Sequence, residues 1–414
     1  MIMRILTLVT TAFARALATF AMLHPAFAMA LPLFAIALTT FAMAVPVHAQ
    51  SEPYTVYDTR SVITEGPYLV ANSETTATIV WLTDTPSHAR VLYGTEGTRS
   101  ETAEPQVDGL APVGTRHVVH LRGLAPGTTY SYEVVATRVV NLKAYWPDKG
   151  LDVRSGPHEF TTFDRRAPTV SFSMVTDTHE DVGRIERLNE VIDWETTDFL
   201  VHTGDAFHWI DSEEHLFRAW LRPTAAGLGH SKPLLYARGN HELRGPFARR
   251  LFDYVPNPEG RFYYARDAGP VHLMVLDTGE DKPDDTNVYS ELNLTTPDRT
   301  EELDWFRQHV TTSERVSEAP FRVIVMHQPR WGWLADGPDA WIQTANDAGV
   351  DLVITGHVHR FSYTPPSPDV AHAYHLLVVG QDQVARVDAT STELTVVVTG
   401  TDGQTVHSLV IPRR

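Results

Sequence analysis

From residue 170 onward the chain contains six short apolar runs, each followed within a few residues by Asp, Asn or His. The runs are residues 170–175, 199–201, 234–236, 271–276, 323–326 and 352–354. Their length and composition are typical of strands that are buried on both faces. Helical patterns lie between several runs: Val182, Ile185 and Leu188 recur at spacings of three, and another pattern follows Pro297. This alternation predicts an α/β domain over residues 167–414.

Residues 51–166 show a different pattern, in which every second residue of each short run is apolar. Ala77, Ile79 and Trp81 share one face of such a run. Turns rich in Gly and Pro separate the runs, which predicts an all-β sandwich. A linker at residues 163–168 would join it to the α/β domain. After residue 381 the β pattern returns at 393–399 and 405–411, and we expect these runs to pair with the main sheet or to cover it.

The first 49 residues have the features of a targeting segment. They contain Arg4 and Arg15 but no Asp or Glu, and two apolar stretches run through them. We predict cleavage before Gln50, with a second candidate site after Ala28, and hence a periplasmic or secreted protein. The alternative is an anchor that is not cleaved, because residues 29–47 are about long enough to span a bilayer.

Charge and cysteine content exclude several classes of function. There are 34 Lys and Arg against 51 Asp and Glu, so the formal net charge is −17, and loss of Arg4 and Arg15 with the first 49 residues would make it −19. This charge opposes binding to nucleic acid polymers and to anionic membranes. The chain has no Cys, which excludes disulfides, thiolate metal sites, iron–sulfur clusters and cysteine nucleophiles.

The polar residues after the apolar runs form a series of metal-binding candidates. In α/β sheets such residues gather at the carboxyl ends of the strands. Seven oxygen or nitrogen ligands on five loops can hold two divalent cations, and the Asp205 carboxylate has two oxygens, one for each ion. The candidate ligands are Asp177, His179, Asp205, Asn240, His327, His357 and His359.

The order of these motifs resembles that of the calcineurin-like metallophosphoesterase superfamily, and the β sandwich in front resembles the architecture of the purple acid phosphatases. The turn at residues 123–130, followed by Tyr132 and Val134, is similar to a fibronectin type III module. The resemblance covers about residues 60–400. It implies an α/β metallophosphoesterase sandwich of mixed sheets flanked by helices, preceded by an all-β fibronectin type III-like domain.

The resemblance also implies a role for each motif residue. One ion would be bound by Asp177, His179, Asp205 and His359, and the other by Asp205, Asn240, His327 and His357. His241 resembles the family's outer His, a catalytic residue near the leaving group. Phosphatases with a fibronectin-like domain have Asp-x-Gly at the first motif and a Tyr three residues after the bridging Asp, where this chain has His179 and His208. The missing Tyr predicts a colourless site with two divalent ions, Zn, Mn or Fe.

The resemblance therefore implies an exported phosphoesterase that depends on two metal ions and uses a metal-bridging hydroxide as nucleophile. We predict a phosphomonoesterase acting on small phosphate esters, with no nucleic acid polymer as partner and no stable membrane span after processing. A phosphodiesterase or nucleotide pyrophosphatase is the alternative, and a non-catalytic binding protein with a structural metal site is a further one. His208 is either a substrate-binding residue or a plain exposed side chain. The sequence leaves open the metals, the physiological substrate and the oligomeric state.

Overall fold

The computed structural model describes residues 55–332 and 337–414. The expected targeting segment, residues 1–49, lies outside the described residues. Among the residues described, no helix combines the length and the apolar character needed to cross a bilayer.

The first part of the chain folds into a β sandwich, here called the N-terminal sandwich. Its strands are β1 (Ile63–Val70), β2 (Thr76–Gly94), β3 (Glu101–Ala103), β4 (Val113–Arg122), β5 (Thr129–Asn141) and β6 (Asp148–Thr161). The long strand β2 pairs through its first half with β1 and β4, and through its second half with β3 and β5. Ala77, Ile79 and Trp81 lie in the core of this sandwich, as the alternating pattern predicts. The predicted all-β sandwich is confirmed.

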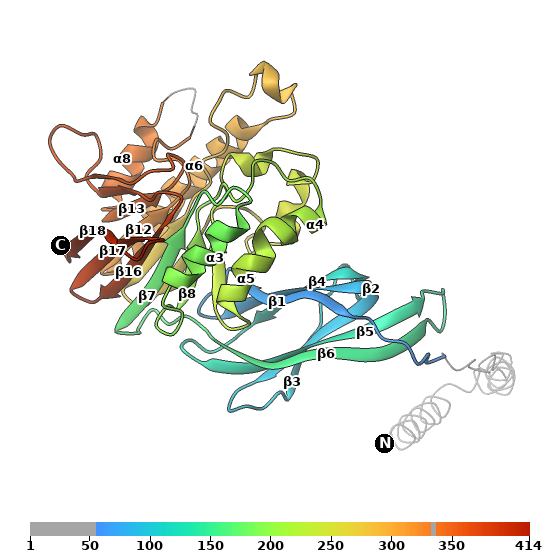
Figure 1. Cartoon of the computed structure of the whole chain (residues 1–414). Coiled ribbons are helices and arrows are strands. Elements are labelled where there is room, and N and C mark those ends of the chain that lie inside the picture. The colour runs from blue at the N-terminus through green and yellow to red at the C-terminus, as the bar shows by residue number, and fades with distance from the viewer. Residues whose placement is uncertain (1–54, 333–336) are drawn as a thin grey trace, which may run out of the picture. The chain divides into compact units, whose positions relative to one another are not determined.

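The remainder, here called the C-terminal α/β part, is built on two mixed sheets (Figure 1). In the first sheet the strand order is β18-β17-β16-β7-β8-β9. These strands are β7 (Thr169–Val175), β8 (Phe199–His202), β9 (Pro233–Tyr236), β16 (Gln383–Thr390), β17 (Glu393–Gly400) and β18 (Thr405–Pro412). In the second sheet the strand order is β10-β11-β12-β13-β15-β14. These strands are β10 (Tyr264–Ala268), β11 (Val271–Val275), β12 (Phe321–Val325), β13 (Leu352–Thr355), β14 (Ser362–Thr364) and β15 (His375–Val378). The C-terminal runs therefore extend the main sheet through β16.

A large apolar core fills the space between the two sheets. Phe172 and Val201 contribute to it from the first sheet, and Val323 and Ile354 from the second. Because β7, β8 and β9 run parallel, as do β11, β12 and β13, each sheet gathers several strand carboxyl ends at one edge. Burial on both faces explains why these strands are continuous apolar runs in the sequence.

Helices cover the outer face of each sheet, so the predicted mixed sheets flanked by helices are confirmed. On the first sheet lie α3 (Val182–Val191), α4 (Glu213–Leu216), the π-helix η2 (Phe217–Leu221) and α5 (Arg222–Leu228). On the second lie α6 (Thr295–Thr312) and α8 (Asp339–Asp347), with the short α7 (Glu314–Glu318) after α6. Helix α6 begins two residues before the predicted start at Pro297, because a proline is tolerated in the first helical turn.

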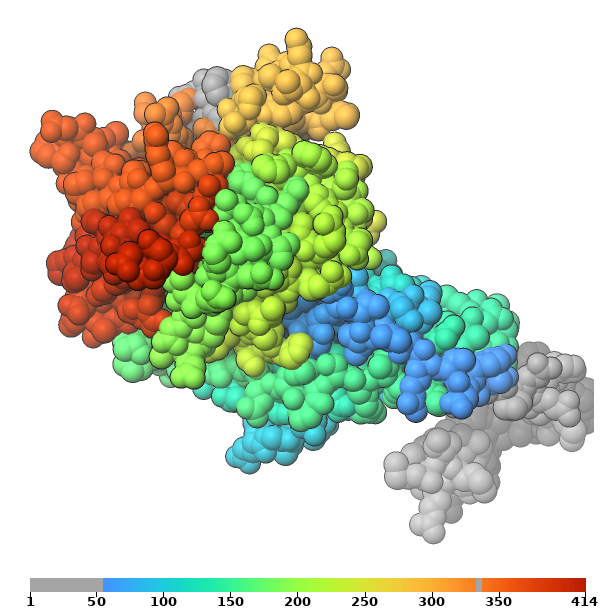
Figure 2. Space-filling model, viewed as in Figure 1, coloured from blue at the N-terminus to red at the C-terminus, as the bar shows by residue number. Residues whose placement is uncertain are grey.

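The N-terminal sandwich and the C-terminal α/β part share one continuous sheet. Strand β1 pairs in parallel with β9, through Leu69 with Pro233 and Val70 with Leu234. Tyr68 of β1 donates a hydrogen bond of 2.8 Å from its hydroxyl to the Tyr254 carbonyl, and its ring lies in the core shared with the first sheet and its helices. Figure 2 shows the blue surface of the sandwich against the green and yellow-green helical residues.

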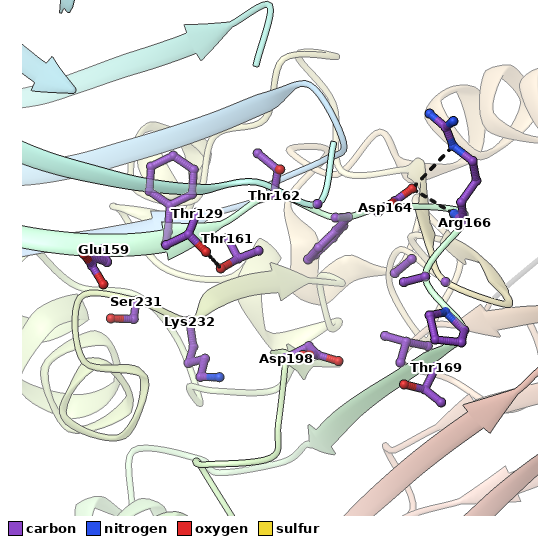
Figure 3. Close-up of a pocket in the computed structure, with 18 residues that line it drawn as sticks. Thr129, Glu159, Thr161, Thr162, Asp164, Arg166, Thr169, Asp198, Ser231 and Lys232 are labelled. Atoms are coloured by element: carbon purple, nitrogen blue, oxygen red, sulfur yellow. Dashed lines mark hydrogen bonds and ion pairs between the residues drawn. The ribbon is translucent and has the colours of Figure 1, made fainter. Parts of the chain in front are cut away.

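A groove of about 810 Å³ lies along the seam between these two parts (Figure 3). Its lining includes Thr129 and Glu159 of the sandwich, and Thr169, Asp198 and Lys232, which lie at or just before the amino ends of β7, β8 and β9. Four of the predicted metal ligands follow the opposite ends of these strands, and none of the seven lines the groove.

Candidate metal centre

The predicted site residues come together in loops at the carboxyl ends of five strands. The loop after β7 carries Asp177 and His179, and the loop after β8 carries Asp205 and His208. The loop after β9 carries Asn240 and leads into the single-turn 3₁₀ helix η3 (His241–Leu243). His327 follows β12, and His357 and His359 follow β13. The site therefore lies where the edges of the two sheets meet.

One group of possible ligands consists of Asp177, His179, Asp205 and His359, whose ligand atoms all lie within 4.8 Å of one another. His179 Nε2 is 3.8 Å from Asp177 Oδ1 and 4.0 Å from Asp205 Oδ2. His359 Nε2 is 3.3 Å from Asp177 Oδ1 and 2.9 Å from His179 Nε2. These four residues are the set that the family resemblance implies for the first ion.

A second group consists of Asp205, His327 and His357, so Asp205 belongs to both. His327 Nε2 is 3.0 Å from Asp205 Oδ2 and 3.2 Å from His357 Nδ1. The Asn240 side-chain oxygen lies 3.1 Å from His357 Nδ1, which adds a neutral oxygen. These distances place all seven predicted ligands in two adjoining groups that share one carboxylate.

The chemistry of these atoms fits bound cations. The Nδ1 atoms of His179 and His327 lie 3.1 Å and 2.7 Å from the carbonyl oxygens of Phe207 and Thr203, so each Nδ1–H donates to a carbonyl and leaves Nε2 as a lone pair. The lone pair of His327 faces a carboxylate oxygen, an arrangement that requires positive charge between the two atoms. Asp177 Oδ1 is buried and accepts no hydrogen bond from any described residue.

The pKa values of His327 and Asp205 reflect the same demand for positive charge. Burial alone would lower the pKa of His327, but the charge of the Asp205 carboxylate and its hydrogen bond raise that pKa to about 10. Burial alone would raise the pKa of Asp205, but the charge of His327 holds it well below its usual range. A divalent cation would meet this demand in place of the proton.

The backbone at the site is held in an unusual conformation. The residues that follow have positive φ angles between 45° and 70°: Asp177, His179, Asp205, His357 and His359. Such angles are uncommon outside glycine, cost about 1–3 kcal/mol each and are concentrated at functional sites. Gly204 and Gly239 lie against each other, and a Cβ on either would collide with the backbone of the other loop. The loops can therefore approach closely enough for Asp205 and Asn240 to reach one site.

Glu242 ties two ligand loops together from behind. It is almost completely buried, and its carboxylate accepts backbone N–H bonds from Asp205 (2.9 Å), Ala206 (2.7 Å) and Gly239 (2.9 Å). Burial, and then the charge of Asp205, raises the pKa of Glu242 to about 7. Glu242 thus orients the two ligand loops, and its oxygens are occupied by backbone donors.

His241 and His208 lie at the open side of the site. His241 Nδ1 is 2.9 Å from the His208 carbonyl, and Nε2 is 3.9 Å from Asp205 Oδ2, so Nε2 faces the metal groups. The exposed His208 ring stacks on that of His179, with 4.8 Å between centroids. Together with His179 these two residues make a third cluster of imidazoles. His241 Nε2 is therefore placed where a group bound at the metals could receive its proton.

Sequence reasoning did not identify two charged residues beside His241. The Arg244 guanidinium lies 3.1–3.2 Å from both ring nitrogens of His241, and the buried Glu280 holds it with two hydrogen bonds. Arg244 follows His241 by three residues, and this spacing could have indicated from the sequence that the two side chains are neighbours. Glu280 had no such signal, because it comes from the distant segment after β11.

Two protein families match the chain. Residues 171–361 match the calcineurin-like phosphoesterase family, and residues 65–162 match the N-terminal domain of purple acid phosphatases. The first match includes all seven candidate ligands together with His208 and His241. No curated protein matches the chain significantly.

Solved structures show a similar fold. Purple acid phosphatase PPD1 from yellow lupin (Lupinus luteus) seeds has a TM-score of 0.62 at 16% identity, covering 84% of this chain and 74% of that one. Weaker likenesses, with TM-scores of 0.36 and 0.30, are the protein TT1561 of Thermus thermophilus (11% identity, 59% of this chain, 100% of that one) and a predicted phosphoesterase of Streptococcus pneumoniae (13% identity, 59% and 98%). The structural likeness therefore rests on the lupin structure, and it concerns the fold.

Proposed function

Because this chain belongs to the calcineurin-like phosphoesterases and carries an N-terminal domain of the purple acid phosphatase type, we propose that it is an exported phosphomonoesterase that uses two divalent metal ions. The observation that carries this proposal is the pair of ligand groups that share Asp205. One carboxylate common to two groups is the arrangement that holds two ions at a fixed separation. When bound, the ions would activate a water molecule and balance the charge that develops on the phosphoryl oxygens.

The ligand assignment follows the two groups. Asp177, His179 and His359 would hold one ion, Asn240, His327 and His357 the other, and Asp205 would bind both. Neutral imidazoles, carboxylates and one amide oxygen suit Zn, Mn or Fe(II). The position three residues after Asp205 is His208, which cannot supply the phenolate of a purple ferric centre, so we propose a colourless site.

His241 would act on the leaving group. Its Nδ1–H bond to the His208 carbonyl fixes the tautomer, and its Nε2 faces Asp205 Oδ2 at 3.9 Å without belonging to either ligand group. In the protonated ring, Nε2–H would donate a proton to the departing oxygen of the ester. General acid catalysis of this kind contributes about 10²–10⁴-fold.

Small monoesters are favoured over other phosphate esters by two features. The N-terminal domain is of the purple acid phosphatase type, and the net charge of −17 opposes polyanionic substrates. A phosphodiesterase or pyrophosphatase remains the alternative, because the ligand set is compatible with each of them. The targeting features of residues 1–49 support export to the periplasm or medium.

The experiment that tests the proposal is a substrate and metal screen of the purified protein. We expect close to two divalent ions per chain by elemental analysis, no strong visible absorption band, and higher turnover of p-nitrophenyl phosphate than of bis-p-nitrophenyl phosphate or ATP. Preference for the diester or for ATP would replace the monoesterase assignment. Inactivity on all esters with both ions present would favour the binding protein.

His241→Ala tests the proposed general acid. We expect the variant to keep both ions and to lose about 10²-fold or more in kcat for alkyl phosphates, whose alkoxide needs a proton, with a smaller loss for p-nitrophenyl phosphate. His230→Ala is a suitable control, since His230 is exposed and precedes the amino end of β9. Equal losses for both leaving groups would assign His241 to binding or electrostatics and not to proton donation.

A further inference from the structure

The segment that carries His241 also places a cation against its ring. His241 begins the 3₁₀ turn η3, and Arg244 is the C-cap of that turn, with its backbone N–H bonded to the His241 carbonyl at 3.1 Å. In 3₁₀ geometry residues i and i+3 lie over each other, so the two side chains leave the turn on the same side. The spacing His-x-x-Arg therefore places the Arg244 side chain on the same side of the turn as the His241 imidazole.

Arg244 contacts the face of the His241 ring through Nη1. Arg244 Nη1 is 3.2 Å from His241 Nδ1 and 3.1 Å from Nε2. The lone-pair directions of the two ring nitrogens diverge, so an atom equally close to both lies over the ring face and not along either direction. Arg244 thus restricts the tilt of the ring and leaves Nδ1 free to donate to the His208 carbonyl.

The guanidinium is itself held by other parts of the chain. Its Nε and Nη2 donate to Glu280 Oε1 and Oε2 at 3.0 and 2.9 Å, a two-point contact that fixes the guanidinium plane. The Glu280 side chain is only 1% exposed, so its position is set by packing. The Arg244 carbonyl accepts the Ile210 N–H at 2.9 Å, which binds this turn to the loop that carries His208.

We infer that Arg244, fixed by Glu280, is a positioning residue that holds the His241 imidazole with Nε2 aimed at the leaving group. The inference rests on the proposed phosphoesterase function. With the ring held from its face by Arg244 and at Nδ1 by His208, the proton on Nε2 is already oriented before substrate binds. A misplacement of about 1 Å at such a group can cost 10²-fold in rate.

The test compares Arg244→Lys with Arg244→Gln. Lysine keeps the charge but has no planar fork that could contact the ring through one nitrogen while meeting Glu280 at two points. We expect both variants to keep two ions and to lose at least about tenfold in kcat for an alkyl phosphate, with less than about threefold for p-nitrophenyl phosphate, because positioning matters where the proton is needed. Activity of Arg244→Lys equal to that of the native protein would overturn the inference, since charge alone would then suffice.

Loss of Arg244 would leave the buried Glu280 carboxylate unpaired, and the Arg244 variants could unfold for that reason alone. Glu280→Gln is therefore the second variant of the test. This variant retains Arg244 but weakens its two-point support, and we expect the same selective loss on alkyl phosphates. Asp281→Asn is the matched control, because Asp281 lies 3.5 Å from the same guanidinium but is 28% exposed. Equal slowing with both leaving groups would assign Arg244 and Glu280 to general stability and overturn the inference.

A second readout does not depend on turnover. In the metal-free protein labelled with ¹⁵N-histidine, His241 should show the Nδ1–H tautomer, with its signals assigned by their loss in His241→Gln. We expect a mixture of tautomers in Arg244→Gln and Glu280→Gln. An unchanged tautomer in both would overturn the positioning role even if turnover fell. If the native protein hydrolysed no ester, the proposed function would fail while this measurement would still report on Arg244.

Discussion

At the scale of single residues, Asp205 is the side chain on which the site depends most. It belongs to both ligand groups, whereas Asp177 belongs to one. We expect Asp205→Asn to lose both ions and to reduce kcat more than about 100-fold. Asp177→Asn, an equally small change, should lose mainly one ion. Elemental analysis after gel filtration measures the difference, and an Asp205→Asn protein that retained two ions would contradict the bridging role.

The metal-binding candidates could be predicted from the sequence because all of them follow apolar strands, five in number. Asp205 and Asn240 are 35 residues apart, yet both follow parallel neighbours, and strand order alone brings their loops together. Glu280 could not be predicted in this way. Its contact with Arg244 depends on how the segment after β11 folds back over η3, which no periodicity in the sequence encodes.

At the scale of elements, the close approach of loops between the two sheets sets the geometry of the site. Gly356 lies between β13 and His357, and a Cβ there would be 2.5 Å from Asp177 Oδ2 and would also collide with Thr176. We expect Gly356→Ala to lower the free energy of unfolding by about 1–3 kcal/mol and to weaken binding of the first ion. Denaturant unfolding and metal titration measure the two effects.

Gly114→Ala is the control for that change. Gly114 lies in β4, a Cβ there would meet nothing within 4 Å, and its φ is not positive. We expect it to be close to neutral in both measurements. If Gly356→Ala behaved like Gly114→Ala, the loops around Asp177 would be able to yield without cost, and the tight packing between β7 and β13 would not define the site.

The strands themselves could be predicted well, and their ends less well. Residues 271–276 read as one apolar run, but β11 ends at Val275, and Leu276 begins the irregular segment that leads to Glu280. Helix α3 was indicated by Ile185 and Leu188, which both face the core. Such periodic elements are determined locally, whereas strand ends depend on which neighbour is still available for pairing.

At the scale of the whole molecule, the sequence did not indicate that the sandwich and the α/β part share a sheet. The change of pattern near residue 166 predicts separate domains, 51–166 and 167–414, and that division stays a prediction. Pairing of β1 with β9 is a contact between strands that are far apart in the sequence, and periodicity carries no information about it. Because the core around Tyr68 spans both parts, we expect them to unfold together.

His117 in the sandwich therefore provides a pH-dependent test of the whole molecule. Its ring is 4% exposed, packs on Trp81 at 5.2 Å and has Nε2 2.9 Å from Thr83 Oγ1. Burial, followed by the charges of His88 and Arg116, lowers its pKa to about 4. The folded protein thus keeps His117 neutral where the unfolded chain, with a pKa of about 6.5, takes up a proton. The contribution of His117 to stability should be constant above about pH 7 and should fall as the pH drops from about 6.5 to 4.

We expect His117→Gln to weaken this dependence. Glutamine does not titrate, so the difference in unfolding free energy between native protein and variant should change by up to roughly 3 kcal/mol between pH 7 and pH 4, in favour of the variant at low pH. Urea unfolding in EDTA at several pH values removes the contribution of metal binding, and a single transition by fluorescence and circular dichroism would show that the sandwich and the α/β part unfold as one.

Parallel pH profiles for the native protein and His117→Gln would mean that His117 is reached by water and protons in the folded state. Two separate transitions, with only one of them sensitive to His117, would mean that the β1–β9 junction does not couple the sandwich to the metal-binding part.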